Sequence, residues 1–258
     1  MIGVHETPAP GSRRTQLAYA YFTPSQAKGT VPRTKDPRSS TPLPAPLPAA
    51  PSSPIVRRME LDLLGTHADR AYPILAGLVV PRPIAWVTTL HENGTVNAAP
   101  FSFFNVFGDD PPLVIFAPGD RDDGTPKDSA RNAKRTGEFV VNLVDPGLAE
   151  VMVRTSAAHP PGVSEAAHEG LATLPSSVVA PPRLAAAPAA LECKVHSILE
   201  IGSNRLILGI VHRVHVRDEL IDPATLRIRQ DHYHPVGRMA VPDWYCHTAD
   251  LFELPRPR

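Results

Sequence analysis

The densest group of side chains that could do chemistry lies between Pro81 and Phe116, where small hydroxyl and amide residues are interspersed with aromatic rings. Proline cannot continue as a central member of a sheet, so the backbone is expected to turn near Pro100 and to expose N–H groups beside apolar rings. Such a ledge suits a planar heterocycle, which needs one apolar face and hydrogen-bond donors at its polar edge. The residues expected to form it are Pro100, Phe101, Ser102, Phe103 and Asn105.

A second group, Lys127-Asp128-Ser129, directly precedes a predicted helix. A helix N-terminus presents free N–H groups and the positive end of the helix dipole, so a nearby lysine and hydroxyl form a suitable cradle for a phosphate. The plainer interpretation is that Asp128 or Ser129 is an ordinary N-cap and that Lys127 is a solvated charge. Arg82, between two prolines at a strand start, is a second phosphate candidate, with a surface arginine as the alternative.

Two further clusters contain histidine. His232 and His234 would share one face of an extended chain, which makes a metal pair conceivable. No third and fourth ligand accompanies them at a convincing spacing, so we predict no metal site and favour surface or barrel-wall histidines. Glu165, His168 and Glu169 lie in a loop bounded by Gly and Pro, where we expect them to face solvent.

The elements that would position these groups are mostly short strands. Strand-forming runs broken by Gly, Pro, Asn and Asp begin near Ile74, and an Asn-Gly turn at 91–94 predicts a hairpin. We predict strands at 79–80, 84–89, 95–99, 113–117, 138–144, 190–200 and 205–216, and helices at 128–135 and 148–156, the first ended by Gly137. Many strands and few helices indicate a mainly β fold, a β-barrel, with Phe104 and Phe107 in its core.

The composition divides the chain at residue 57. Residues 1–57 hold eleven of the 31 prolines and seven basic against two acidic side chains, so we predict a disordered N-terminal arm. A targeting peptide and a polyproline tether are the alternatives. Residues 58–258 are expected to form one folded domain. Since Lys and Arg equal Asp and Glu over the whole chain, at 26 each, this domain is mildly acidic.

That charge balance gives no electrostatic case for nucleic acid, because phosphate binding needs clustered positive charge. Only Cys193 and Cys246 are present, far apart, so we expect no disulfide framework and a reducing cytoplasm. No apolar run approaches the ~20 residues that cross a bilayer, so we expect no membrane insertion.

Five blocks then follow one another in a recognisable order: PRPIAWVTT at 81–89, NAAPFSFFN at 97–105, DDPPLVIF at 109–116, KDSARN at 127–132 and TGEFVVNLV at 136–144. From about Tyr72 to Tyr245 the chain resembles the flavin reductase-like family of FMN-binding split barrels. The resemblance implies a six-stranded split β-barrel that forms a homodimer, with FMN at the dimer interface.

The resemblance also implies an activity, the transfer of a hydride from NAD(P)H to flavin, with the reduced flavin supplied to a partner flavin-dependent monooxygenase. The flavin carries that chemistry, so no catalytic side chain is required. This agrees with the absence of a Ser-His-Asp order and of a G-x-S-x-G elbow. The G-x-G-x-x-G turn is also absent, so the nicotinamide must bind without it. A non-catalytic FMN-binding electron-transfer protein of the flavoredoxin type is the alternative, and a flavin-free β-barrel interaction module is a third.

Site residues follow from the matched blocks. Ser102, Phe103 and Asn105 match a loop that lies along the isoalloxazine, and Thr88 and Thr89 match a strand end beside the ribityl chain and phosphate. Alternatively, the threonines are simply strand formers and the phenylalanines core residues. The full set of expected flavin-binding residues is Arg82, Thr88, Thr89, Pro100, Phe101, Ser102, Phe103, Asn105, Lys127 and Ser129, and the expected nicotinamide side is His232, His234 and Arg238.

Overall fold

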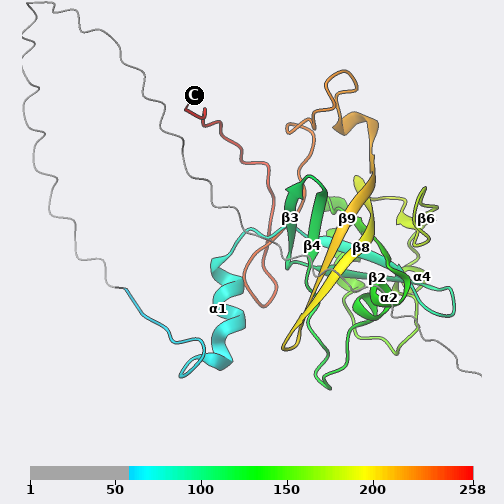
Figure 1. Cartoon of the computed structure of the whole chain (residues 1–258). Helices are drawn as coiled ribbons and strands as arrows, with labels where there is room; N and C mark the ends of the chain where they lie inside the picture. Colours follow the sequence, from blue (N-terminus) through cyan, green and yellow to red (C-terminus); the bar gives the residue numbers. More distant parts are fainter. Residues whose placement is uncertain (1–57, 258) are drawn as a thin grey trace, which may run out of the picture. The chain divides into compact units, whose positions relative to one another are not determined.

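The computed structural model describes residues 58–257 (Figure 1). The predicted arm at 1–57 lies outside the described residues. A 3-10 turn, Ala68–Arg70, leads into α1, Ala71–Leu78. The strand predicted at 79–80 is wrong, because Val79 is the C-cap of α1 and its N–H donates to the Leu75 carbonyl at 3.0 Å. Pro73 is compatible with this helix, since the first turn needs no N–H partner at that position.

A seven-stranded antiparallel sheet is the body of the fold. Its strands are β1 Ala85–Leu90, β2 Val96–Phe101, β3 Phe104–Asp109, β4 Pro112–Phe116, β5 Glu138–Asn142, β8 Ala189–Ile201 and β9 Asn204–Val216. Their order is β2-β1-β5-β8-β9-β4-β3, which leaves β2 and β3 as free edges. The prediction of a mainly β fold is confirmed, although the sheet has seven strands where six were expected.

The remaining elements are short. They are α2 Asp128–Thr136, α3 Ala149–Arg154 and α4 Glu165–His168, the 3-10 turns Pro146–Leu148 and Asp218–Leu220, and the strand pairs β6 Thr173–Leu174 with β7 Arg183–Leu184 and β10 Gly237–Arg238 with β11 Tyr245–Cys246. Helix α2 packs on β1 and β2, and α4 packs on β2 (Figure 1). Within residues 58–257, no helix is long and apolar enough to cross a bilayer.

Local turn chemistry forms the two predicted hairpins. Between β1 and β2, Gly94 has φ of +80°, and the Asn93 carboxamide oxygen accepts the Thr95 N–H at 3.1 Å. Gly202, with φ of +57°, closes the long hairpin of β8 and β9. Glycine is favoured at both turns because it has no Cβ to clash in the left-handed region. Both hairpin predictions are confirmed.

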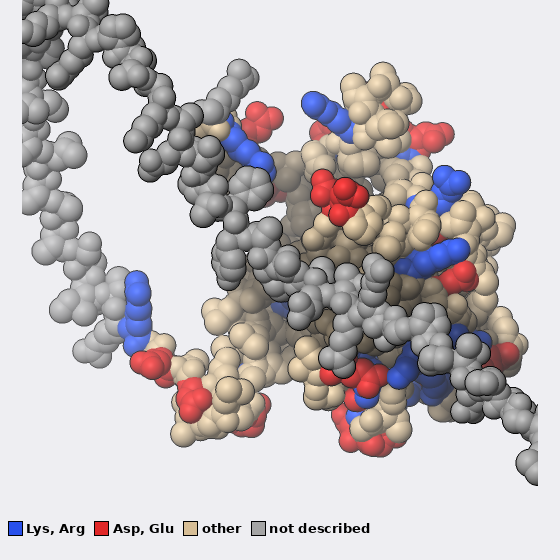
Figure 2. Space-filling view, viewed as in Figure 1, with Lys and Arg blue, Asp and Glu red and all other residues tan. Residues whose placement is uncertain are grey.

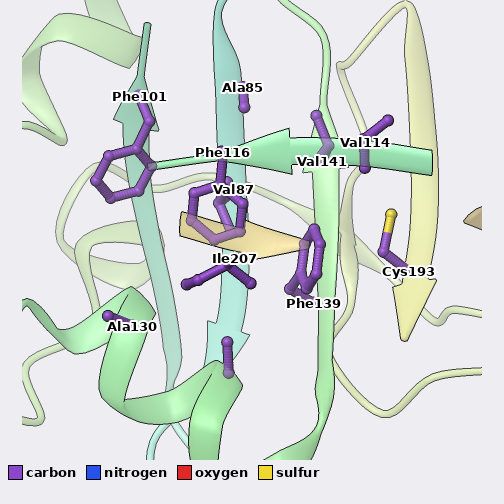
Figure 3. Packing of buried hydrophobic residues seen from close by; sticks show 11 residues of the cluster. Ala85, Val87, Phe101, Val114, Phe116, Ala130, Phe139, Val141, Cys193 and Ile207 are labelled. Carbon is purple, nitrogen blue, oxygen red and sulfur yellow. The ribbon is translucent and has the colours of Figure 1, made fainter. Parts of the chain in front are cut away.

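The main core lies between α2 and the sheet. The Phe116 and Phe139 rings pack at a tilt of 57° with their centroids 5.0 Å apart, and Ile207 and the small residues of β1 and α2 fill the space around them (Figure 3). A Cβ placed at Gly209 would lie 2.3 Å from Cζ of Phe139, so only glycine lets this ring reach β9. Strand β1 is buried on both faces, since Ala85 and Val87 belong to this core while Trp86 belongs to a second cluster.

The prediction that Phe104 and Phe107 are core residues is half wrong. Phe104 is partly buried and packs against the main core, but Phe107 is 61% exposed. The register of β3 against β4 shifts between Val106 and Gly108, so Phe107 lies in a bulge and leaves the inward alternation of the strand.

Candidate functional site

A cavity of about 570 Å³, here called the first pocket, opens beside the edge strand β2. Its walls come from β2, the loop after β4, the start of α2, the segment after α3 and the first residue of α4. The lining residues that matter below are Asn97, Pro100, Phe101, Lys127, Ser129 and Glu165. The pocket therefore brings together four of the residues predicted to bind a cofactor, namely Pro100, Phe101, Lys127 and Ser129.

The start of α2 has no side-chain cap. Lys127 occupies the N-cap position, and no side chain accepts a hydrogen bond from the first turn. The prediction that Asp128 or Ser129 caps the helix is wrong. The Asp128 carboxylate is held by Arg121, at 3.1 Å, and by Arg131, while the Ser129 hydroxyl accepts a hydrogen bond from the Asn97 carboxamide at 2.9 Å. The first N–H groups of α2 therefore remain available to a ligand.

Lys127 is exposed at this helix start, and its ammonium nitrogen lies 5.9 Å from the centroid of the Phe101 ring. Within residues 58–257 it forms no ion pair. The positive end of a helix dipole disfavours a cation, so both the lysine and the helix would gain from an anion bound between them.

The expectation that Glu165, His168 and Glu169 face solvent is wrong for Glu165. Its side chain is buried, and Oε2 accepts the backbone N–H of Ala98 at 3.0 Å. The neighbouring Ser164 hydroxyl donates to the Val96 carbonyl at 2.6 Å, so the two residues cover the free edge of β2. Burial raises the pKa of Glu165 above its ordinary value. His168 does face solvent, whereas Glu169 is partly buried and pairs with Arg154 at 2.6 Å.

The two strand threonines lie inside the protein rather than in the first pocket. Thr88 and Thr89 are fully buried. The Thr88 hydroxyl donates to the Pro182 carbonyl at 2.6 Å, and the Thr89 hydroxyl accepts from the Asn132 carboxamide at 3.1 Å. Both hydroxyls are thus engaged by the protein itself.

Arg82 lies in the wall of a second pocket of about 330 Å³. The wall is formed by the segment just before β1, by β3, by the residues just after β5, by β8 and by the segment around Tyr233 and Gly237. The Arg82 guanidinium is buried and donates to the carbonyls of Ala76, Val79 and Met239, the last two at 3.0 and 2.9 Å. Nε also donates to the Ser102 hydroxyl at 3.3 Å. Burial lowers the pKa of this guanidinium. The donors of Arg82 are therefore occupied, and the side chain connects the end of α1, the turn after β2 and the segment around Met239.

The other residues predicted to contact the flavin ring, Ser102, Phe103 and Asn105, follow Phe101 of the first pocket in the sequence, and Asn105 lines the second. Ser102 and Phe103 form the turn from β2 to β3. Phe103 is 40% exposed, and its ring packs edge-on against Tyr72 at a centroid distance of 6.1 Å. Asn105 is exposed and lines the second pocket, with its carboxamide oxygen accepting the Val106 N–H at 2.8 Å. The backbone does turn directly after β2, as expected, but the strand itself runs through Pro100, which edge strands tolerate.

The expected nicotinamide side is near the second pocket. The segment that carries His232 and His234 is a turn followed by coil, so the expectation of an extended chain is wrong. The His232 N–H donates to the Arg229 carbonyl at 3.0 Å, and His234 Nε2 lies 3.1 Å from the Asp231 carbonyl. Arg238 stacks on Tyr245 with its guanidinium carbon 4.5 Å from the ring centroid. Among the described residues, no group of three or more His, Cys, Asp or Glu is arranged to hold a metal.

Sequence reasoning missed three residues at the first pocket. Asn97 holds Ser129, Arg121 holds Asp128, and Glu165 holds the edge of β2. Asn97 begins the NAAPFSFFN block, whereas Arg121 and Glu165 lie outside the recognised blocks. The partners of Asn97 and Glu165 are distant in the sequence, and Arg121 lies close to Asp128. The only available signal was that polar Asn97 interrupts an otherwise apolar strand.

A family model for the flavin reductase like domain matches residues 77–237. A relative from Deinococcus radiodurans is 44% identical over 200 residues, covering 76% of this chain and 88% of its own, and Bacillus subtilis YwrF is 37% identical, covering 74% and 95%. Both are named only as uncharacterized proteins.

Two crystal structures are also similar. The 2-nitrobenzoate 2-nitroreductase NbaA of Pseudomonas fluorescens is 36% identical with a TM-score of 0.70, covering 77% of this chain and 96% of its own. Nitrilotriacetate monooxygenase component B of Bacillus cereus is 30% identical with a TM-score of 0.73, covering 77% and 100%. With the sheet described above, these matches show that the chain belongs to the flavin reductase-like family and has its split-barrel fold.

Proposed function

We propose that this protein transfers a hydride from NAD(P)H to FMN and supplies the reduced flavin to a partner monooxygenase. The main support for this proposal is the first pocket. There the uncapped start of α2, with Lys127 and Ser129, lies next to the apolar wall formed by Pro100 and Phe101. This combination of anion donors and apolar surface is what a flavin mononucleotide requires. When bound, FMN would supply the two-electron chemistry.

The protein's own residues would bind the flavin and the nicotinamide nucleotide and orient them. Lys127 and the first N–H groups of α2 would hold the phosphate, and Ser129, fixed by Asn97, would add a hydroxyl. Pro100 and Phe101 would contact the apolar part of the ligand and exclude water from it. We assign the nicotinamide nucleotide to the side formed by His232, His234 and Arg238, close to the second pocket.

The names of similar proteins suggest two kinds of molecule that could receive electrons from the reduced flavin. The similarity to nitrilotriacetate monooxygenase component B favours delivery of reduced flavin to an oxygenase. The similarity to 2-nitrobenzoate 2-nitroreductase favours a second candidate, the direct reduction of a nitroaromatic ring. The second pocket, whose wall includes Ile84, Leu143 and Val236, has the apolar surface that such a ring would need.

The test is the oxidation of NADH and of NADPH by the purified full chain, followed at the nicotinamide absorbance with FMN, FAD or no flavin added. The proposal predicts sustained oxidation that depends on FMN and on protein. A protein that binds FMN but oxidises neither nucleotide would contradict the reductase and favour the electron-transfer alternative. A protein that binds no flavin would favour the interaction module. Addition of 2-nitrobenzoate separates the two acceptors, because only direct reduction consumes it.

We also propose that the protein is a homodimer. Strand β3 is a free edge that exposes Val106 and Phe107, and an apolar edge of this kind is usually covered by another chain. Light scattering should report about twice the chain mass of 27.9 kDa. A monomer that retains FMN would contradict a flavin site that needs two chains.

The charge distribution favours small ligands over nucleic acid as partners. On the face shown in Figure 2, Lys and Arg side chains of the described residues lie interspersed with Asp and Glu side chains. Nucleic-acid binding draws on a continuous basic surface.

A further inference from the structure

Glu165 is a buried acid in the wall of the first pocket. Glu165 is 7% exposed, and its one protein partner from another element is the Ala98 N–H, at 3.0 Å. The backbone N–H groups of Ala98 and of Glu165 itself are neutral donors, and they offset only part of the free energy that a carboxylate loses on leaving water. A carboxyl group in this position is therefore sensitive to any further negative charge placed in the pocket.

The groups facing Glu165 come from several elements. Burial is the main cause that raises the pKa of Glu165, and Asp128 of α2 adds to it. The N–H groups of Ala98 and of Glu165 itself, and then His91 in the β1–β2 turn, act in the opposite direction and offset only part of the rise. Lys127, Arg121 and His159 also line the pocket, as do the acids Asp120, Asp122 and Asp123, of which Asp120 pairs with Arg205 at 2.8 Å. The charged groups on its own helix and just after it, His168 and Glu169, are engaged with each other and with Arg154.

Glu165 is tied to the same strand segment that builds the anion site. Along β2, Asn97 donates to the Ser129 hydroxyl, Ala98 donates to Glu165, and Pro100 and Phe101 continue the pocket wall. A phosphate at Lys127 and Ser129 would therefore share one pocket with the Glu165 carboxyl.

We propose that Glu165 is a positioning residue for this wall of the pocket, and that its carboxyl takes up one proton from solvent when a phosphate-bearing ligand binds there. The inference rests on the flavin site proposed above. The phosphate adds negative charge beside the acid and so favours its protonated form, and by linkage the protonated acid favours the phosphate. Protonation preserves the contact to β2, because the carbonyl oxygen of the acid still accepts the Ala98 N–H.

The coupling has a definite sign. At low pH, Glu165 is protonated before and after binding and has no effect on affinity. As the pH rises from the pKa of Glu165 in the free protein to its higher pKa in the complex, binding includes the uptake of a proton and affinity for the phosphate ligand falls; above both pKa values it levels off. Riboflavin has no phosphate and should not show this loss.

The test compares Glu165→Gln with the wild type in FMN and riboflavin titrations from about pH 4, just below the ordinary pKa of a glutamate, to about pH 8. Glutamine keeps the acceptor for Ala98 but cannot ionise. We expect the ratio of wild-type to variant dissociation constants for FMN to rise from about one at low pH to about tenfold at high pH, and the ratio for riboflavin to stay flat. The ratio cancels the ionisation of the FMN phosphate itself. Glu150→Gln, which removes an exposed acid of α3 outside the pocket, should give a flat ratio for both ligands.

A flat FMN ratio with Glu165→Gln, while FMN still binds, would overturn the proton coupling and leave the flavin site intact. If neither ligand binds the wild type, the proposed function fails. If Glu165→Gln does not fold, infrared difference spectra of the wild type decide. The carbonyl band of a protonated carboxylic acid should appear on adding FMN and not riboflavin, and its absence with FMN would overturn the inference.

Discussion

Replacing Lys127 with alanine is expected to weaken FMN binding by about one to two decades, because a charge-assisted hydrogen bond contributes about 1.5–3 kcal/mol. Lys127 is exposed, lies at the uncapped start of α2 and has no carboxylate partner among residues 58–257, so its removal leaves the fold intact. Riboflavin binding should hardly change, since only FMN carries the phosphate. Fluorescence titration of both flavins on the same variant measures this difference.

Lys134→Ala is the matched control for this prediction. Lys134 belongs to the same helix, but it lies in the last turn and pairs with Glu200 at 3.0 Å. Its removal should leave both flavin affinities unchanged. Equal losses of FMN and riboflavin affinity in Lys127→Ala would show that Lys127 does not contact the phosphate, even if the flavin does lie in the first pocket.

Predictions from local signals agree well with the structure. The Asn-Gly turn, the glycine-closed hairpin of β8 and β9, and the left-handed C-cap at Gly137, with φ of +72°, each depend on residues adjacent in the sequence. The exception is the strand predicted at Val79–Val80. Val79 and Val80 follow α1, which takes up the Val79 N–H at its C-cap, and periodicity over so short an apolar run does not reveal whether it forms a strand.

Predictions that depended on distant partners were less successful. Glu165 is a polar residue in a loop-like segment, and nothing near it in the sequence announces that the edge of β2 lies against it. The Phe107 bulge depends on the register of a neighbouring strand. Arg82 donates to Met239, 157 residues further along the chain. Tertiary contacts of this kind determine which polar side chains are free to bind a ligand. Residue type alone does not reveal these contacts.

For the buried Arg82 we predict a loss of stability, in contrast to the exposed Lys127. Arg82→Ala should lower the free energy of unfolding by about 3 kcal/mol, because three carbonyls lose a charged donor in a buried place. For a domain of this size, that corresponds to a fall in melting temperature of about 6–12 °C. Arg82→Lys should recover only part of the loss, since one ammonium cannot reproduce the planar arrangement of the guanidinium donors.

The effect of Arg82→Ala on ligands should also differ from that of Lys127→Ala. Arg82 holds the Ser102 hydroxyl and lies 5.9 Å from the centroid of the Phe103 ring, so its removal frees the turn that was predicted to lie along the flavin ring. FMN and riboflavin should therefore lose affinity together. Ser102→Ala, which removes a single long contact, should reproduce part of that shared loss with little change in melting temperature. If Arg82→Ala instead weakened FMN alone and left the melting temperature unchanged, Arg82 would be a phosphate ligand, and the chain would hold the flavin phosphate at the second pocket rather than at the start of α2.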